Sequence, residues 1–216
     1  DWNLYSPLWA PVSLEGKWLK MSDRDPFDYC RIERKIPASK ELKVAFDIKA
    51  DQNDKGLLQI EFLDENSIAC ARIDLNPDGT MLSKGGARYG KLLNYEAGKS
   101  YHVEVILSVS KRMSEVFIDG KKAGQRMFFA PVAAIERIAF RTGERRTFPT
   151  IDTPADWDGT LADAGEQEPL VAYSIANFQT SSTDVSASAA VLNYNNYKHY
   201  VDYFNGMEDE NIAQAI

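Results

Sequence analysis

Apolar and polar residues alternate strictly in several short stretches of this chain, and the alternation limits what it can fold into. Residues 42–50 (LKVAFDIKA) and 101–109 (YHVEVILSV) each place apolar side chains at every second position. Successive side chains of a strand point to opposite faces of its sheet, so this period predicts strands that are buried on one side only. Strands of this kind are typical of antiparallel sheets that pack on one another.

Further strand-like stretches recur along the chain, with turn residues between them. They are residues 16–21, 29–36, 57–63, 68–75, 113–118, 135–140 and 170–178. Asn76-Pro77-Asp78-Gly79 is a strong turn signal, and Asp119-Gly120 supplies the pair of positive φ angles that a type I′ hairpin needs. We therefore predict an all-β fold, a two-sheet antiparallel sandwich of about ten to twelve strands, with no helix before residue 185.

The composition of the chain changes after residue 178. Residues 179–190 (QTSSTDVSASAA) have the composition of a linker, and residues 191–216 carry a helical stripe of Tyr197, Tyr200, Val201 and Phe204. We expect a sandwich over 1–178, a linker over 179–190 and a short helical tail over 191–216. The tail would be the start of a following domain, and the chain a piece of a longer protein.

Charge argues against one class of partner, and hydropathy argues against a membrane span. The formal net charge is −7 and the pI is about 5.0, which argues against nucleic acid as a partner. No run of eighteen apolar residues occurs in the sequence, so we expect no membrane span. The two cysteines, Cys30 and Cys70, lie in strand-like stretches and are either buried free thiols or, if their strands are neighbours, a disulfide.

Two groups of segments resemble known domains. Residues 101–105 together with 115–121 (EVFIDGK) resemble the signature of laminin G-like, concanavalin A-like jelly rolls. Residues 14–19, 23–29, 37–39 and 135–143, with Arg145 and Pro149, are similar to accessory jelly-roll domains of bacterial polysaccharide-degrading proteins. The resemblance implies a jelly-roll sandwich in a secreted, periplasmic or cell-surface bacterial protein, beside a further domain of the same polypeptide.

A stripe of polar residues gives the first candidate site. It alternates with apolar residues in the predicted strands and comprises Arg31, Glu33, Gln59, Glu61, Arg72, Asp74, Arg137 and Arg141. The stripe is either a solvated face or a platform that binds a sugar or uronate, because the planar guanidinium of arginine suits carboxylates and paired hydroxyls. As ligand-binding residues we single out Arg31, Glu61, Arg72 and Arg141.

A long loop over 144–169 extends this candidate site. Arg145 and Arg146 follow the stripe directly, and Trp157 lies between two aspartates. An exposed indole can stack on the apolar face of a pyranose, although Trp157 could equally anchor the loop to the sandwich. We add these three residues to the predicted ligand-binding set.

Asp23, Asp25 and Asp28 form the candidate metal site. The resemblance implies that a calcium ion can lie at the edge of such a sandwich, and carboxylate oxygens are the ligands that calcium prefers. The same sequence, Asp-x-Asp-Pro-x-Asp, also fits an ordinary turn. Calcium is the only cofactor that the sequence suggests.

No complete catalytic constellation is visible in the sequence. The only histidines are His102 and His199, and no serine or cysteine lies in a nucleophile elbow. We therefore expect an accessory module of a secreted glycan-degrading protein, which binds carbohydrate or braces a catalytic domain. The alternative is a domain of a glycoside hydrolase or polysaccharide lyase that contributes to its active site.

Overall fold

The structure is a computed structural model and describes residues 2–25, 28–143 and 170–182. These residues form fourteen strands and contain no helix, and all of them belong to one unit, Asp1–Val185. The helical tail predicted over 191–216 and most of the predicted linker lie outside the described residues.

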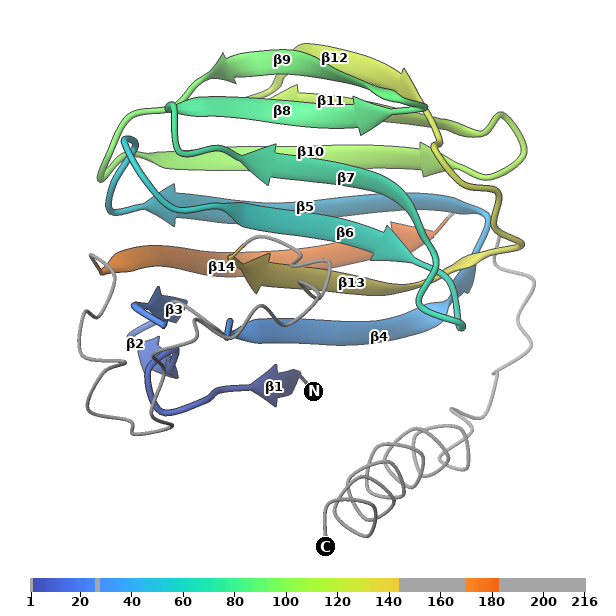
Figure 1. Ribbon diagram of the computed structural model, residues 1–216. Helices are drawn as coiled ribbons and strands as arrows, with labels where there is room; N and C mark the ends of the chain where they lie inside the picture. Colours follow the sequence, from blue (N-terminus) through green and yellow to red (C-terminus); the bar gives the residue numbers. More distant parts are fainter. Residues whose placement is uncertain (1, 26–27, 144–169, 183–216) are drawn as a thin grey trace, which may run out of the picture. The chain divides into compact units, whose positions relative to one another are not determined.

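The strands form two antiparallel sheets of seven strands each, shown in Figure 1. The first sheet consists, in spatial order, of β1 (Asn3–Tyr5), β4 (Arg31–Ser39), β13 (Ile135–Thr142), β6 (Leu58–Leu63), β7 (Ala69–Leu75), β8 (Thr80–Gly85) and β9 (Arg88–Asn94). The second consists of β12 (Lys121–Met127), β11 (Met113–Ile118), β10 (Ser100–Ser108), β5 (Glu41–Ala50), β14 (Val171–Ser182), β3 (Trp18–Asp23) and β2 (Val12–Glu15). The predicted all-β sandwich is confirmed.

The core lies between the two sheets and consists of the alternating apolar residues. In β5, Leu42, Val44, Phe46 and Ile48 are all buried. The ring of Phe46 meets Phe140 of β13 edge to face, with 5.1 Å between ring centroids and an interplanar angle of 87°. Aromatic pairs prefer this arrangement, so the contact joins the middle of one sheet to the middle of the other.

The tight turns have the backbone that their residues predict. Asp119 and Gly120 have φ angles of 50° and 76°, and they connect β11 to β12. This is the pair of positive angles required by a type I′ hairpin. The hairpin predicted from Asp-Gly is confirmed.

The last strand is longer than the sequence indicated. β14 continues to Ser182 because residues 179–182 pair with residues 42–45 of β5, beyond a bulge at residues 177–178. The predicted end of the sandwich at Phe178 therefore falls inside a strand. The polar composition of residues 179–182 hid it, since they lie at the exposed end of β14.

Both cysteines are free and buried, which decides between the two alternatives left by the sequence. Cys30 precedes β4 and Cys70 lies in β7, so β13 and β6 separate their strands. Burial raises the pKa of each thiol to about 12. Among the described residues, no helix is long and apolar enough to cross a membrane.

Candidate functional site

The outer face of the first sheet carries two neighbouring rows of polar side chains. In one row Arg31, Arg141, Gln59 and Asp74 lie opposite one another on β4, β13, β6 and β7. Residues opposite each other on paired strands project to the same side of the sheet. The apolar residues next to them in sequence point into the core, so the alternation itself brings this row together.

The second row lies two residues along each strand. It runs from Glu33 through Ala139 to Glu61 and Arg72, and continues to Lys84 and Tyr89. We call the two rows together the polar face, which comprises Arg31, Glu33, Gln59, Glu61, Arg72, Asp74, Lys84, Tyr89 and Arg141. The four described residues that the sequence singled out, Arg31, Glu61, Arg72 and Arg141, all lie on it.

A buried ion pair forms the centre of the polar face. The Nε and Nη2 atoms of Arg72 both donate to Oε1 of Glu61, at 3.1 and 2.7 Å. Their side chains are only 9% and 2% exposed, so the pair is shielded from solvent. Burial alone would lower the pKa of Arg72, but the charges of Glu61 and Asp74 outweigh it and raise that pKa.

Asp74 lies beside this pair and is the most perturbed carboxyl of the polar face. Burial raises its pKa to about 6, and the nearby charge of Glu61 adds to the increase. Arg72, the hydroxyl of Tyr89 and Lys84 lower the pKa in part. Carboxyls with perturbed pKa values cluster at functional sites and also occur in structural ion-pair networks, so this pKa marks Asp74 as a candidate site residue.

Several buried polar atoms of the polar face have no hydrogen-bond partner among the described residues. Three of them are Oδ1 of Asp74, Oε1 of Gln59 and Nε of Arg31. Asp74 is 4% exposed and Gln59 is 5% exposed. A buried polar atom without a partner costs about 1–3 kcal/mol, so three in one row of the sheet require an explanation. A bound ligand with hydroxyl groups would supply the missing partners.

The two arginines of the first row are held in different ways. Arg31 forms an ion pair with Glu33, with 2.5 Å between Nη2 and Oε2. Glu33 also lies 3.6 Å from Nη1 of Arg137. The guanidinium of Arg141 stacks on the ring of Tyr29, 3.8 Å from its centroid. This contact is a close cation–π interaction, which fixes the plane of the guanidinium.

Aromatic rings border the polar face on two sides. Tyr5 packs against Tyr29 at one edge, with 5.3 Å between ring centroids. At the other edge Phe129 lies 4.5 Å from Nζ of Lys84, and Tyr89 is 47% exposed. Polar groups between aromatic rings are a usual composition for a site that binds an amphipathic ligand.

The predicted calcium ligands accept hydrogen bonds from nearby groups in the structure. Asp23 Oδ1 accepts a hydrogen bond from the backbone of Asp25, and Asp25 Oδ1 accepts one from the backbone of Asp28. The carboxylate of Asp28 accepts hydrogen bonds from Tyr29 and from the hydroxyl of Tyr5. These hydrogen bonds are those of an ordinary turn, and calcium binding by the three aspartates stays a prediction. Across residues 2–25, 28–143 and 170–182, no three acidic, histidine or cysteine side chains are arranged to hold a metal ion.

Asp23 has a second role at the end of β13. The hydroxyl of Thr142 donates to Oδ2 of Asp23 at 2.5 Å, and the backbone N–H of Cys30 donates to the same hydroxyl at 3.0 Å. This buried chain of hydrogen bonds joins the turn to the first sheet next to Arg141. The predicted ligands Arg145, Arg146 and Trp157 lie outside the described residues.

Comparison with known proteins identifies the family. Residues 2–157 match the family described as "Sialidase-like, CBM domain". The chain belongs to this family. As a CBM domain, it is an accessory module of the carbohydrate-binding kind, as the resemblance implied. No curated protein sequence gives a significant match.

A solved structure titled "Sialidase" is similar to most of this CBM domain. The two share 66% sequence identity over 95% of this chain, with a TM-score of 0.80. The match covers 19% of the sialidase chain, so the CBM domain spans about a fifth of that protein's length.

More distant structures share the fold only. An alginate lyase from Corynebacterium sp. is 8% identical, with a TM-score of 0.55 over 82% of each chain. The carbohydrate recognition domain of Emp47p is 9% identical, with a TM-score of 0.53 over 84% of this chain and 88% of its own. The predicted jelly-roll class is thereby confirmed.

Sequence reasoning missed the aromatic border of the polar face in this CBM domain. Tyr89 lies in a stretch whose alternation is broken by a bulge in β9, so no strand period marked it. Phe129 lies between strands, in a segment whose backbone N–H binds the carbonyl of Cys70. No pattern in the neighbouring sequence marks either residue as part of the site. Only the pairing of distant strands brings them there.

Proposed function

We propose that the CBM domain binds carbohydrate on the polar face, as an accessory module of a longer glycan-degrading protein. The observation that carries this proposal is the set of buried, partnerless atoms on Asp74, Gln59 and Arg31. Each of these atoms costs free energy in the unliganded protein. Binding of a ligand that pairs them recovers this cost, so the site is prepared for such a ligand.

The chemistry of the three atoms matches sugar hydroxyl groups. Asp74 Oδ1 and Gln59 Oε1 accept hydrogen bonds, whereas Arg31 Nε donates one, and a hydroxyl does both. The rings of Tyr5, Tyr29 and Tyr89 provide surfaces for the C–H face of a pyranose. Arg145, Arg146 and Trp157 follow β13 in sequence and remain proposed ligand contacts.

The proposed context is a bacterial protein that is secreted, periplasmic or on the cell surface. The likeness to a small part of a sialidase chain supports a neighbouring domain of the same polypeptide as a partner. Polysaccharides are met outside the cytoplasm, which supports this location. The net charge of −7 supports the absence of nucleic acid among the partners.

Affinity electrophoresis through gels that contain a panel of polysaccharides tests the proposal. The informative variants are Arg31→Gln and Gln59→Leu. Arg31→Gln leaves Glu33 paired with Arg137, and Gln59→Leu removes only a polar group that lacks a partner at Oε1. Both variants should therefore fold, and circular dichroism checks this.

We expect at least one polysaccharide to retard the wild-type protein, and either substitution to weaken binding about tenfold. Lys43→Gln is the control, because Lys43 lies on the other sheet in an exposed ion pair with Glu104. Retardation unchanged in both polar-face variants, or equally reduced in the control, would overturn the proposal.

A second candidate function follows from the pKa of Asp74. A carboxyl with a pKa of about 6 beside a second carboxyl, Glu61, is suited to general acid catalysis near neutral pH. The domain would then contribute to the active site of a glycoside hydrolase or polysaccharide lyase. Release of reducing ends or unsaturated uronates by this chain, lost in Asp74→Asn, would favour this function over pure binding.

A further inference from the structure

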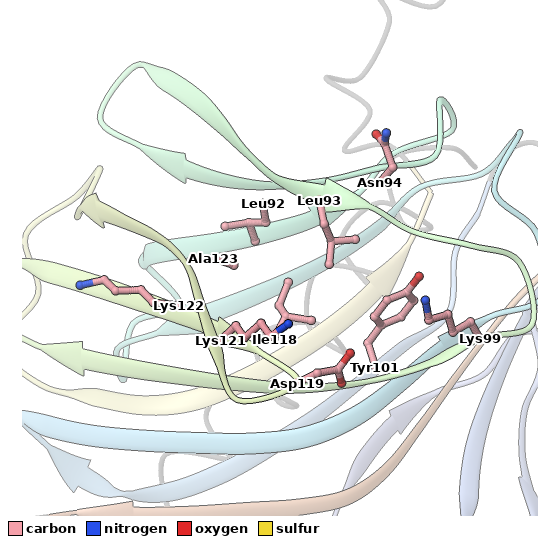
Figure 2. A pocket seen from close by; sticks show the side chains of 10 residues that line it. All are labelled: Leu92, Leu93, Asn94, Lys99, Tyr101, Ile118, Asp119, Lys121, Lys122 and Ala123. Carbon is pink, nitrogen blue, oxygen red and sulfur yellow. The ribbon is translucent and has the colours of Figure 1, made fainter.

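A groove opens at the edge of the sandwich, where the edge strands β9 and β12 of the two sheets face each other (Figures 1 and 2). Its volume is about 480 Å³, within the range of small-molecule sites. Its residues come from β9, the start of β10, and the hairpin of β11 and β12. None of them belongs to the polar face.

Each of the two edge strands carries a β-bulge at this groove. The register of β8 and β9 shifts so that Leu92 is the extra residue, and the register of β11 and β12 shifts so that Ala123 is the extra residue. Both extra residues line the groove. Bulges bend an edge strand and re-aim its side chains, and they often lie next to functional sites. The groove is therefore formed by two separate departures from regular pairing.

Glycines close the sandwich beside the groove. A Cβ atom at Gly124 of β12 would come within 2.7 Å of the Leu92 side chain, and one at Gly90 of β9 would overlap the guanidinium of Arg126. The two edge strands thus meet closely along this stretch. They part toward Lys99 and Tyr101, where the groove lies (Figure 2).

The groove has an apolar floor and a basic rim. Figure 2 shows Leu93 and Ile118 between the strands, with Lys99 beside Tyr101 at one end and Lys122 at the other. Lys121 adds a third ammonium group, and among the described residues Asp119 is the only carboxylate that lines the groove. The side chain of Asn94 supplies both a donor and an acceptor.

The lysines are available to a ligand. Lys99 pairs with Glu96 at 2.6 Å and Lys122 with Glu115 at 2.9 Å, but all four side chains are substantially exposed. Exposed pairs contribute little stability, so an anionic ligand can replace their carboxylates. Within the described parts of the chain, Lys121 takes part in no ion pair.

Protection of an exposed strand edge is the simplest role for such lysines, since charge there prevents pairing with other chains. The bulges fit that role as well, because they twist an edge away from other chains, but the role requires no concave apolar floor. We propose that the groove is a second binding site, independent of the polar face, for an anionic saccharide. Its carboxylate or sulfate contacts the lysines, and its C–H face lies on Leu93 and Ile118.

An NMR titration of the ¹⁵N-labelled chain tests this proposal. Three probes are used: trigalacturonic acid for a carboxylate source, a sulfated galactose trisaccharide for a sulfate source, and the methyl ester of trigalacturonic acid as the neutral match. We expect at least one anionic probe to shift the amide signals of residues 92–94, 99–101 and 118–123. Lys99→Gln and Lys121→Gln should each weaken this binding about tenfold.

Lys111→Gln is the matched control. Lys111 is exposed in the turn between β10 and β11, which lies at the opposite end of these strands from the groove. Gln59→Leu on the polar face should leave the groove signals unchanged, so failure of one site is distinguishable from failure of the other. If neither anionic probe shifts the groove signals, or the neutral ester binds as well, the proposal is overturned. Binding of only one anionic probe supports the proposal and shows whether the groove prefers a carboxylate or a sulfate.

Discussion

The raised pKa of Asp74 makes the stability of the folded protein depend on pH. Its pKa is about 6 in the folded protein, against 3.8 for an ordinary aspartate. Between these two values the folded state holds a proton that the unfolded state has lost. The free energy of unfolding therefore falls as the pH rises through this window, by about 3 kcal/mol once the pH exceeds 6.

We predict that Asp74→Asn stabilises the protein at pH 7.5 by up to about 3 kcal/mol and has little effect at pH 3.5. Asparagine resembles the protonated carboxyl, so it avoids the cost of burying a charge. Urea unfolding of both proteins at the two pH values measures this difference. An equal effect at both pH values would show that Asp74 is not the titrating group.

The two cysteines give a prediction about reactivity. Burial and a pKa of about 12 leave almost no thiolate on Cys30 or Cys70 at neutral pH. We expect neither thiol to react with Ellman's reagent in the folded protein at pH 8. Both should react once guanidinium chloride unfolds the chain. Rapid reaction of either thiol in the native protein contradicts the described packing.

For single residues, the sequence predicted which positions are polar, but not which of them form the candidate binding site. Arg31, Glu61, Arg72 and Arg141 were expected on one face, and alternation placed them there. The importance of Gln59 and Asp74 depends on atoms without partners and on neighbours from other strands. These properties arise only when β6 and β7 pair, so no local pattern marks them.

Turn glycines connect the strands, and two of them form a matched pair for experiment. Gly79 and Gly120 both have a φ of 76°. A Cβ atom at Gly120 would meet open space, whereas one at Gly79 would lie 2.9 Å from the backbone oxygen of Asn53. The first position therefore isolates conformational strain, and the second adds a steric clash.

We predict that Gly120→Ala costs about 1–2 kcal/mol of unfolding free energy, from the strain of a left-handed alanine. Gly79→Ala should cost more, because the backbone of Asn53 must also shift. Thermal unfolding of the two variants beside wild type compares them. Equal losses would mean that the loop near Asn53 adapts without cost.

At the scale of elements, regular strands were predictable and irregular ones were not. Residues 42–50 and 101–109 became β5 and β10 because their period of two survives intact. The bulges at Leu92 and Ala123 interrupt that period, so the residues of β9 and β12 show no clean alternation. The groove that they form was therefore invisible before the strands were paired.

Residues 2–25, 28–143 and 170–182 form a sandwich whose two outer faces carry different side chains. Its core, centred on the contact between Phe46 and Phe140, holds both sheets in register. The two-sheet sandwich followed from alternation and turns, because these report directly on burial, whereas the jelly-roll class came from the resemblance. The predicted contributions of Arg145, Arg146 and Trp157 stay predictions, since those residues lie outside the described parts.

We predict that Phe46→Ala destabilises the sandwich by about 3–5 kcal/mol, since Phe46 is fully buried between the sheets. Equilibrium unfolding in urea measures this loss. A loss below about 1 kcal/mol would show that the contact between the sheets is not central to the core. Any weakening of glycan binding in this variant should scale with the unfolded fraction alone.

A crystal structure with bound oligosaccharide tests whether the polar face holds a sugar. The ligand should be the tightest-binding oligosaccharide from the panel. We predict sugar hydroxyls within hydrogen-bond distance of Asp74 Oδ1, Gln59 Oε1 and Arg31 Nε. A complex in which the sugar lies elsewhere and these three atoms gain no ligand contact would contradict the claim.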